Sequence, residues 1–175
     1  MFLRRFYPDH RAESVYQMDF GELYKKGVRG VLFDIDNTLV PHGAPADQAA
    51  VRLFAALRET GFQTCLISNN KPPRILPFAR AVGSDCICDA HKPSRTGYLE
   101  AMKRMGTTAA DTIFVGDQLF TDVYGAKRAG IPSWLVRPIH PKEEIQIVLK
   151  RYPERIVLYF YERERRKKGR KRKKG

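Results

Sequence analysis

The sequence predicts an α/β fold: a Rossmann-like three-layer sandwich in which helices cover both faces of a mainly parallel central sheet. Three observations support this prediction. Short apolar, β-prone runs alternate with segments of helical length and periodicity along most of the chain. Several of these runs end directly in polar residues, as strands do at the ligand-binding edge of an open sheet. The length of 175 residues and the apolar content of 43% allow one domain with a proper core.

Residues 1–27 form an N-terminal arm that is rich in aromatic and basic side chains. Asp19 is predicted to cap a short helix that continues to about Lys26, and Gly27 is expected to end it. Two interpretations of the arm are open. It packs on the domain, or it contacts a membrane interface, where aromatic and arginine side chains suit the depth of the lipid headgroups.

Strands and helices are predicted to alternate over residues 28–137. The predicted strands are residues 31–33, 62–67, 85–88, 112–115 and 133–136. The predicted helices run from the Asp47 cap to about residue 60 and over residues 72–82, 96–105 and 121–129. Their ends carry the expected signals, such as a glycine after the first helix and prolines at the start of the second. This regular alternation predicts a parallel sheet.

The C-terminal part of the domain is less regular. Residues 142–151 have a helical pattern. Residues 156–161 are all apolar, so periodicity does not assign them, but Pro153 at a first helical turn favours a helix. We place the end of the domain, residues 28–161, at this segment.

Most of the net charge of +13 lies in a C-terminal tail, residues 162–175. The tail holds ten Lys or Arg and two Glu, a balance of +8, which leaves +5 for residues 1–161. Because it has no apolar residue to bury, we expect the tail to be disordered, or at most a frayed extension of a helix. Its role is open between contact with an anionic membrane surface, contact with RNA, and no role beyond solubility.

Cysteine usage and hydropathy indicate the compartment. Cys65, Cys86 and Cys88 are an odd number on predicted internal strands, which favours buried free thiols in a reducing environment. No second cysteine pair is present to complete a zinc site. No window approaches about 18 uninterrupted apolar residues, and the N-terminus lacks the apolar region of a signal peptide. We therefore expect a cytoplasmic protein, with peripheral association at a membrane left open.

Polar side chains of matching chemistry follow four of the predicted strands. Asp34 and Asp36 come directly after the first, and two carboxylates so close repel each other unless a cation intervenes. A hard ion such as Mg2+ takes oxygen ligands of this kind, and substrate phosphate completes its shell. The carboxyl ends of parallel strands share one edge of the sheet, so groups remote in sequence can converge there. The further groups at predicted strand ends are Ser68, Lys92, Asp117 and Asp122.

Each of these residues also has an ordinary structural explanation when it is taken alone. Ser68 could cap a helix, Lys92 could be a solvated side chain, and Asp122 could be an acid on a helix surface. Their occurrence together at successive strand ends favours a phosphate-binding and metal-binding site.

Taken in order, these motifs resemble those of the haloacid dehalogenase (HAD) superfamily of phosphatases. The matching segments are Asp34-Ile35-Asp36-Asn37-Thr38-Leu39, Ser68-Asn69-Asn70, Lys92-Pro93 and Gly116-Asp117-Gln118-Leu119-Phe120-Thr121-Asp122. The resemblance spans residues 28–137, and the first and last motifs look like those of the capless subclass IIIA. Within that subclass, the chain is similar to small bacterial phosphatases related to mitochondrial phosphatidylglycerophosphate phosphatases.

The resemblance implies a role for each catalytic residue. Asp34 would be the nucleophile that attacks phosphorus and forms an aspartyl-phosphate. Asp36 would protonate the departing alkoxide and then deprotonate the water that releases phosphate. Lys92 would balance the charge of the nucleophile and the phosphate.

The resemblance also implies how phosphate and metal are held. The Ser68 hydroxyl and the Asn69 amide would bind a phosphoryl oxygen. Mg2+ would be bound by Asp34, Asp117 and the backbone carbonyl of Asp36. Asp122 would hold a metal-bound water or Lys92 in place.

The spacing of the motifs leaves no room for a cap domain. Only 31 residues separate Asp36 from Ser68, and 23 separate Ser68 from Lys92. An uncapped site suits a phosphate on something large, so with the basic tail and the resemblance we expect phosphatidylglycerophosphate as the substrate. The alternatives are a phosphatase of soluble or nucleic-acid phosphomonoesters, and an RNA-associated or ribosome-associated scaffold that uses the tail.

Overall fold

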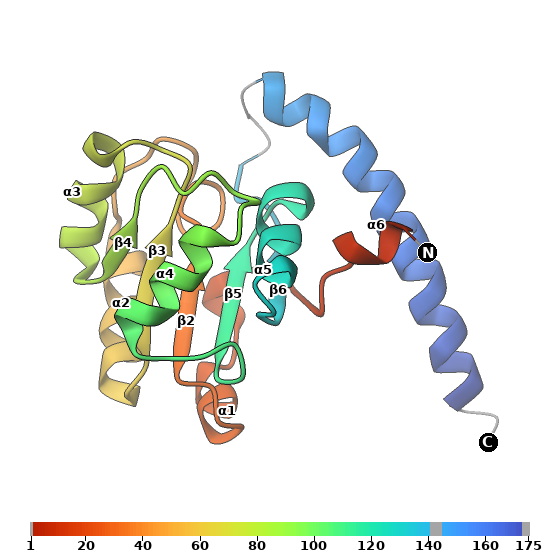
Figure 1. Cartoon of the computed structure of the whole chain (residues 1–175), viewed down its shortest axis with the longest axis horizontal. Helices are drawn as coiled ribbons and strands as arrows, with labels where there is room; N and C mark the ends of the chain where they lie inside the picture. The colour runs from red at the N-terminus through yellow and green to blue at the C-terminus, as the bar shows by residue number, and fades with distance from the viewer. Residues whose placement is uncertain (1, 141–144, 173–175) are drawn as a thin grey trace.

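The computed structural model of the protein describes the backbone of residues 2–140 and 145–172 and the side chains of residues 2–140 and 152–167. These residues form a six-stranded sheet in the order β1-β6-β5-β2-β3-β4, and every neighbouring pair is parallel. Helices cover both faces of this sheet (Figure 1), which confirms the predicted Rossmann-like fold. The strands are β1 (His10–Ala12), β2 (Gly30–Phe33), β3 (Gln63–Ile67), β4 (Asp85–Ile87), β5 (Thr112–Gly116) and β6 (Ser133–Val136).

The helices lie between the strands largely where the sequence predicts them. They are α1 (Phe20–Lys25), α2 (Gln48–Thr60), α3 (Pro72–Val82), α4 (Thr96–Met105), α5 (Tyr124–Arg128) and α6 (Ile145–Arg172), with short turns η1 (Phe2–Phe6), η2 (Val15–Gln17) and η3 (Leu119–Val123). The side chain of Asp47 accepts a hydrogen bond from the Ala50 amide and caps α2 as predicted. The predicted helix at residues 121–129 begins two residues earlier, because η3 is a π-helical turn that leads into α5.

Two apolar layers hold the helices on the sheet. On one face, Phe54 of α2 and Phe78 of α3 belong to the same buried cluster as Phe33 of β2. On the other face, Tyr98 of α4 packs in a cluster with Leu32 of β2. Neighbouring residues of β2 thus point into opposite layers, and all four residues of this strand are buried. This central position holds the segment that follows β2 firmly in place.

The N-terminal arm contributes a strand that the sequence analysis missed. Residues His10–Ala12 pair with β6 and extend the sheet at its edge. Asp9 fixes this attachment, because its carboxylate accepts hydrogen bonds from the Ser133 amide and hydroxyl and pairs with Lys127 at 2.9 Å. The arm therefore packs on the domain, as one of our two interpretations expected.

The C-terminal segment forms a longer helix than expected. The expected helix over residues 156–161 is confirmed within α6, and α6 continues to Arg172, where we expected residues 162–175 to be disordered or at most a frayed extension of a helix. Lys, Arg and Glu favour helix, and extending a helix that is already packed needs no new nucleus. Ion pairs of Glu162 with Arg11 and of Glu164 with Arg4 also bind this segment to the arm. Residues 142–144 and 173–175 lie outside the described residues.

Among the described residues, no helix has the length and the apolar content that crossing a bilayer would require.

Candidate active site

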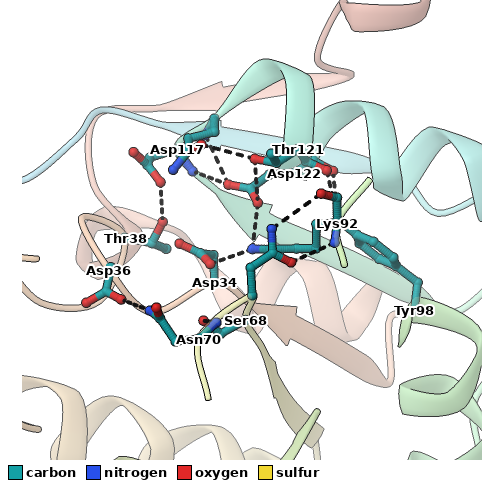
Figure 2. A network of polar contacts seen from close by, with 12 residues as sticks. Asp34, Asp36, Thr38, Ser68, Asn70, Lys92, Tyr98, Asp117, Thr121 and Asp122 are labelled. Atoms are coloured by element: carbon teal, nitrogen blue, oxygen red, sulfur yellow. Dashed lines mark hydrogen bonds and ion pairs between the residues drawn. The ribbon is translucent and has the colours of Figure 1, made fainter. Parts of the chain in front are cut away.

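The loops after four strands bring the predicted residues together at the carboxyl ends of the strands (Figure 2). Asp34 follows β2, Ser68 follows β3, Lys92 lies in the loop after β4, and Asp117 follows β5. Because β2 lies between β3 and β5 in the sheet, Asp34 is at the centre of the group. The convergence expected from the strand ends is therefore present in the structure.

Lys92 links two carboxylates at the bottom of the site. Its Nζ donates to Asp34 Oδ1 at 2.5 Å and to Asp122 Oδ1 at 2.7 Å. The side chains of Lys92, Asp34 and Asp122 are only 4%, 9% and 1% exposed. A charged lysine is this deeply buried only when it is paired, and here two carboxylates share that pairing.

The burial of this group shifts its proton equilibria. Burial raises the pKa of Asp34 to about 7, because Lys92 offsets only part of the desolvation and Asp122 adds a second negative charge nearby. Burial alone would lower the pKa of Lys92, but the charges of Asp122 and Asp34 outweigh it and raise the pKa above its ordinary value. Lys92 is therefore held as a cation beside the Asp34 carboxyl.

Asp122 also shapes the backbone of the neighbouring loop. Its Oδ2 accepts hydrogen bonds from the amides of Asp117 at 3.1 Å and Gln118 at 3.0 Å. A Cβ at Gly116 would lie 2.5 Å from this same Oδ2, so only glycine fits there. Asp122 thus positions Lys92 with one oxygen and the Asp117 loop with the other.

Asp36 is held from the side of α3. Its Oδ1 accepts hydrogen bonds from Arg74 Nη2 at 2.8 Å and from the Gly43 amide at 2.9 Å. Its Oδ2 accepts a hydrogen bond from Asn70 Nδ2 at 2.6 Å. The sequence analysis missed Arg74, although its place in the first turn of the helix after the Ser68 motif was a usable signal.

The Ser68-Asn69-Asn70 motif is fixed by local hydrogen bonds. Ser68 Oγ accepts a hydrogen bond from the Asn70 amide at 3.1 Å. The side chain of Asn69 accepts from the Lys92 amide at 2.6 Å and donates to the Lys92 carbonyl oxygen at 3.3 Å. Asn69 thereby ties the loop after β3 to the loop that carries the lysine.

These groups line a small pocket of about 180 Å³. Asp34, Asp36, Ser68, Asn69 and Lys92 face it. The pocket also has polar walls that the sequence analysis did not assign to the site. They come from Asn37, His42, Asn70, Gln118 and Thr121. A polar pocket of this size suits one phosphoryl group and the first atoms of the group that carries it.

Three buried carboxylates, of which only Asp34 lines this pocket, fit a hard divalent cation. Carboxylate oxygens of Asp34, Asp117 and Asp122, all buried, lie within 4.8 Å of one another. Asp122 already accepts hydrogen bonds from Lys92 and two amides. Asp34 and Asp117 are therefore the better pair of ligands, in keeping with the one or two carboxylates that Mg2+ usually takes.

Several acids and one buried lysine at the edge of a Rossmann-like sheet are the arrangement expected of a haloacid dehalogenase-type hydrolase. The comparison with protein families agrees, because the model of the haloacid dehalogenase-like hydrolases matches residues 43–130. The chain belongs to this family. Between β2 and β3, and again between β3 and β4, the structure has one helix and no inserted domain, as in the capless members.

The relatives narrow the family to phosphatases. The chain is 30% identical over 159 residues to the probable phosphatase YqeG of Bacillus subtilis, which covers 90% of this chain and 92% of that protein. It is 28% identical over 177 residues to phosphatidylglycerophosphate phosphatase 1 of Arabidopsis thaliana. That match covers 91% of this chain but only 48% of the plant protein. The chain is therefore a phosphoric monoester hydrolase.

Solved structures share the fold at low sequence identity. The cobalt-bound deoxy-D-mannose-octulosonate 8-phosphate phosphatase of Haemophilus influenzae has a TM-score of 0.52 at 16% identity and covers 63% of this chain and 69% of its own. A protein of Legionella pneumophila described as a putative HAD subfamily III A hydrolase has a TM-score of 0.51 at 16% identity. The match covers 66% of this chain and 69% of that protein. These likenesses support the fold.

Proposed function

We propose that the chain is a Mg2+-dependent phosphatase that acts through an aspartyl-phosphate on Asp34, with phosphatidylglycerophosphate as its substrate. One observation carries the proposal. The Asp34 carboxylate is buried against Lys92 and yet faces the small polar pocket that Ser68 also lines. A nucleophile held by a cation at the bottom of a pocket is positioned to attack a phosphoryl group that enters from above.

Binding places the phosphoryl group against cations and hydrogen-bond donors. The Ser68 hydroxyl and the Asn69 amide bind a phosphoryl oxygen, and Lys92 neutralises part of its charge. Because the charge of the transferring group spreads over its oxygens, donors fixed in advance supply most of the acceleration. Asn69 fixes the position of the Lys92 backbone relative to these phosphate-binding groups, through its two hydrogen bonds to that residue.

The first chemical step forms a bond between an Asp34 oxygen and phosphorus while the bond from phosphorus to the leaving alkoxide breaks. Asp36 gives a proton to that alkoxide, which departs as an alcohol. In the second step, Asp36 takes a proton from a water molecule, which attacks phosphorus. The acyl-phosphate bond breaks, inorganic phosphate leaves, and Asp34 returns as a carboxylate.

The residues that would hold Mg2+ are Asp34, Asp117 and the backbone carbonyl of Asp36. When bound, the ion would neutralise charge on the nucleophile and on the phosphoryl oxygens. Thr38 Oγ1 donates to Asp117 Oδ1 at 3.3 Å and orients that carboxylate. Asp122 holds Lys92 and the backbone of the Asp117 loop, and so would support the ion indirectly.

Two observations support a lipid phosphate as the substrate. The segments on either side of β3 carry no cap, so the pocket is open to a phosphate on a large or membrane-borne molecule. The relative from Arabidopsis thaliana is named as a phosphatidylglycerophosphate phosphatase, although the chain spans about half of its length.

The test is phosphate release from phosphatidylglycerophosphate in mixed vesicles, compared with a panel of soluble sugar, nucleotide and nucleic-acid monoesters. The proposal expects the lipid to be hydrolysed with the highest kcat/KM, and activity to be lost in Asp34→Asn. Turnover of soluble esters without turnover of the lipid would contradict the proposed substrate but not the proposed reaction mechanism.

A further inference from the structure

Over residues 152–167, whose side chains the structure describes, helix α6 packs on the domain with one face. Val157 is 3% exposed and clusters with Leu119 and Val123 of η3. Glu154 is 5% exposed and accepts a hydrogen bond from the Leu119 amide at 2.8 Å. In Figure 1 this helix extends beyond the sheet, and η1 lies beside it. The opposite face of α6 remains on the surface.

The exposed face carries large side chains that soluble helices usually bury. Tyr152 is 65% exposed, Ile156 is 58% exposed and Tyr159 is 62% exposed. Their spacing of four and three residues places them in one row along the helix. A contiguous exposed row of this kind marks an interaction surface more often than a single exposed leucine does.

Basic side chains continue the same row. Arg155, Arg163 and Arg166 are exposed and follow the helical period of the apolar residues. Tyr159, Arg163 and Arg166 also line a shallow hollow of about 440 Å³, together with Glu162 and Lys167. We call Tyr152, Arg155, Ile156, Tyr159, Arg163 and Arg166 the α6 stripe.

Two of the three acids of α6 pair with arginines of the N-terminal arm rather than with the stripe. Glu162 pairs with Arg11 at 2.7 Å, and Glu164 pairs with Arg4 at 3.2 Å. Glu154 is buried on the packed face. The stripe therefore combines apolar area with a net positive charge.

We propose that the α6 stripe docks the protein on an anionic lipid bilayer. The inference rests on the proposed function in one respect only, because a lipid substrate gives such docking a purpose. Tyrosine and isoleucine suit the boundary between headgroups and acyl chains, and arginine pairs with lipid phosphates. Anionic bilayers attract basic segments next to their surface.

Other occupants fit this stripe less well. Single-stranded RNA would stack on the tyrosines, but Ile156 lies between them and has no aromatic face for a base. A second copy of the chain, docked through the same stripe, would bring three arginines of each copy together. A bilayer accepts both kinds of side chain at once.

The helix that carries the stripe packs against an element of the catalytic site. Val157 and Glu154, on the opposite face of the same helix, contact the start of η3. The same η3 carries Thr121, which lines the pocket, and Asp122, which holds Lys92. A bilayer-docked α6 thus holds the pocket at a constant position relative to the lipid surface.

The test is co-sedimentation of the full chain with vesicles of phosphatidylglycerol and phosphatidylcholine, and with vesicles of phosphatidylcholine alone. The proposal expects binding to the anionic vesicles that weakens with salt. Ile156→Ser/Tyr159→Ser keeps every charge and should reduce binding about tenfold, and Arg163→Glu/Arg166→Glu should do the same. All variants should keep their activity on a soluble ester, which also shows that they fold.

Matched controls lie on other exposed helix faces. Leu76→Ser/Leu99→Ser changes two side chains that are 39% and 44% exposed on α3 and α4. Arg80→Glu/Lys103→Glu changes the net charge as much as the stripe variant does. If the stripe is the contact, both controls should bind vesicles within about twofold of the wild type. They change the net charge or the exposed apolar area about as much as the stripe variants do, but at other places on the surface.

Several results would overturn the proposal. The wild type could fail to bind anionic vesicles, or the stripe and control variants could lose binding equally. The stripe could also prove necessary for binding RNA or for forming a dimer, and not for binding vesicles. The vesicles lack the substrate, so stripe-dependent binding without lipid turnover would refute the substrate alone. Lipid turnover that is indifferent to the stripe would refute the docking alone.

Discussion

Replacing Asp122 by asparagine should both destabilise the protein and inactivate it. Asp122 accepts hydrogen bonds from Lys92 on Oδ1 and from two amides on Oδ2, and its side chain is 1% exposed. An asparagine offers one acceptor oxygen and one NH2 group. Either orientation therefore sets a donor against a donor, and Lys92 also loses one of its two buried counter-charges.

The expected loss of unfolding free energy is about 3–5 kcal/mol, which is the cost of breaking a buried charge pair from one side. We also expect kcat on a soluble phosphate ester to fall at least about a hundredfold, since a displaced lysine no longer meets the developing charge. Chemical denaturation and steady-state kinetics measure the two effects. Glu13→Gln is the control: its pair with Arg137 is exposed, so it should cost about 1 kcal/mol or less. A stable and active Asp122→Asn variant would refute the argument that Asp122 positions Lys92.

Three further predictions test other contacts. Arg74→Ala should lower kcat about tenfold with little change in KM, because Asp36 loses the contact that orients it, whereas Arg80→Ala on the same helix should have no effect. Hydrogen bonds from Ser133 and Lys127 outweigh burial and lower the pKa of Asp9, so its contribution to stability is present above about pH 4 and disappears below the folded pKa. The difference in urea midpoint between wild type and Asp9→Asn should accordingly shrink from pH 7 to pH 3, and a constant difference would contradict this. Removal of divalent ions should abolish phosphate release, and Mg2+ should restore activity and raise the Tm of wild type but not of Asp117→Ala.

The convergence of the candidate site residues could be predicted because it follows from the topology. In a parallel sheet, residues that directly follow strands meet at the carboxyl ends of those strands, so the sequence alone places Asp34, Ser68 and Asp117 together. The contact between Arg74 and Asp36 could not be predicted in this way. It depends on the direction in which α3 leaves the sheet, and the strand pattern does not specify that direction.

The sequence analysis missed strand β1 and underestimated the length of the C-terminal helix, for similar reasons. Strand β1 has only three residues, His10–Ala12, with no apolar alternation, and its partner β6 is remote in the sequence. The tail at residues 162–172 was expected to be disordered or at most a frayed helical extension, because it has no apolar side chain to bury. Its helix instead continues from a packed one and is held by contacts to Arg4 and Arg11, which are visible only in three dimensions.

Asp34 is the residue that becomes phosphorylated in the proposed reaction. Beryllium fluoride imitates the phosphoryl group of an aspartyl-phosphate, so binding can be followed by fluorine NMR on the purified chain with Mg2+. We predict a Mg2+-dependent fluoroberyllate signal in wild type that is absent in Asp34→Asn. A signal that persists in that variant, or no signal in an active wild-type preparation, would contradict the central claim.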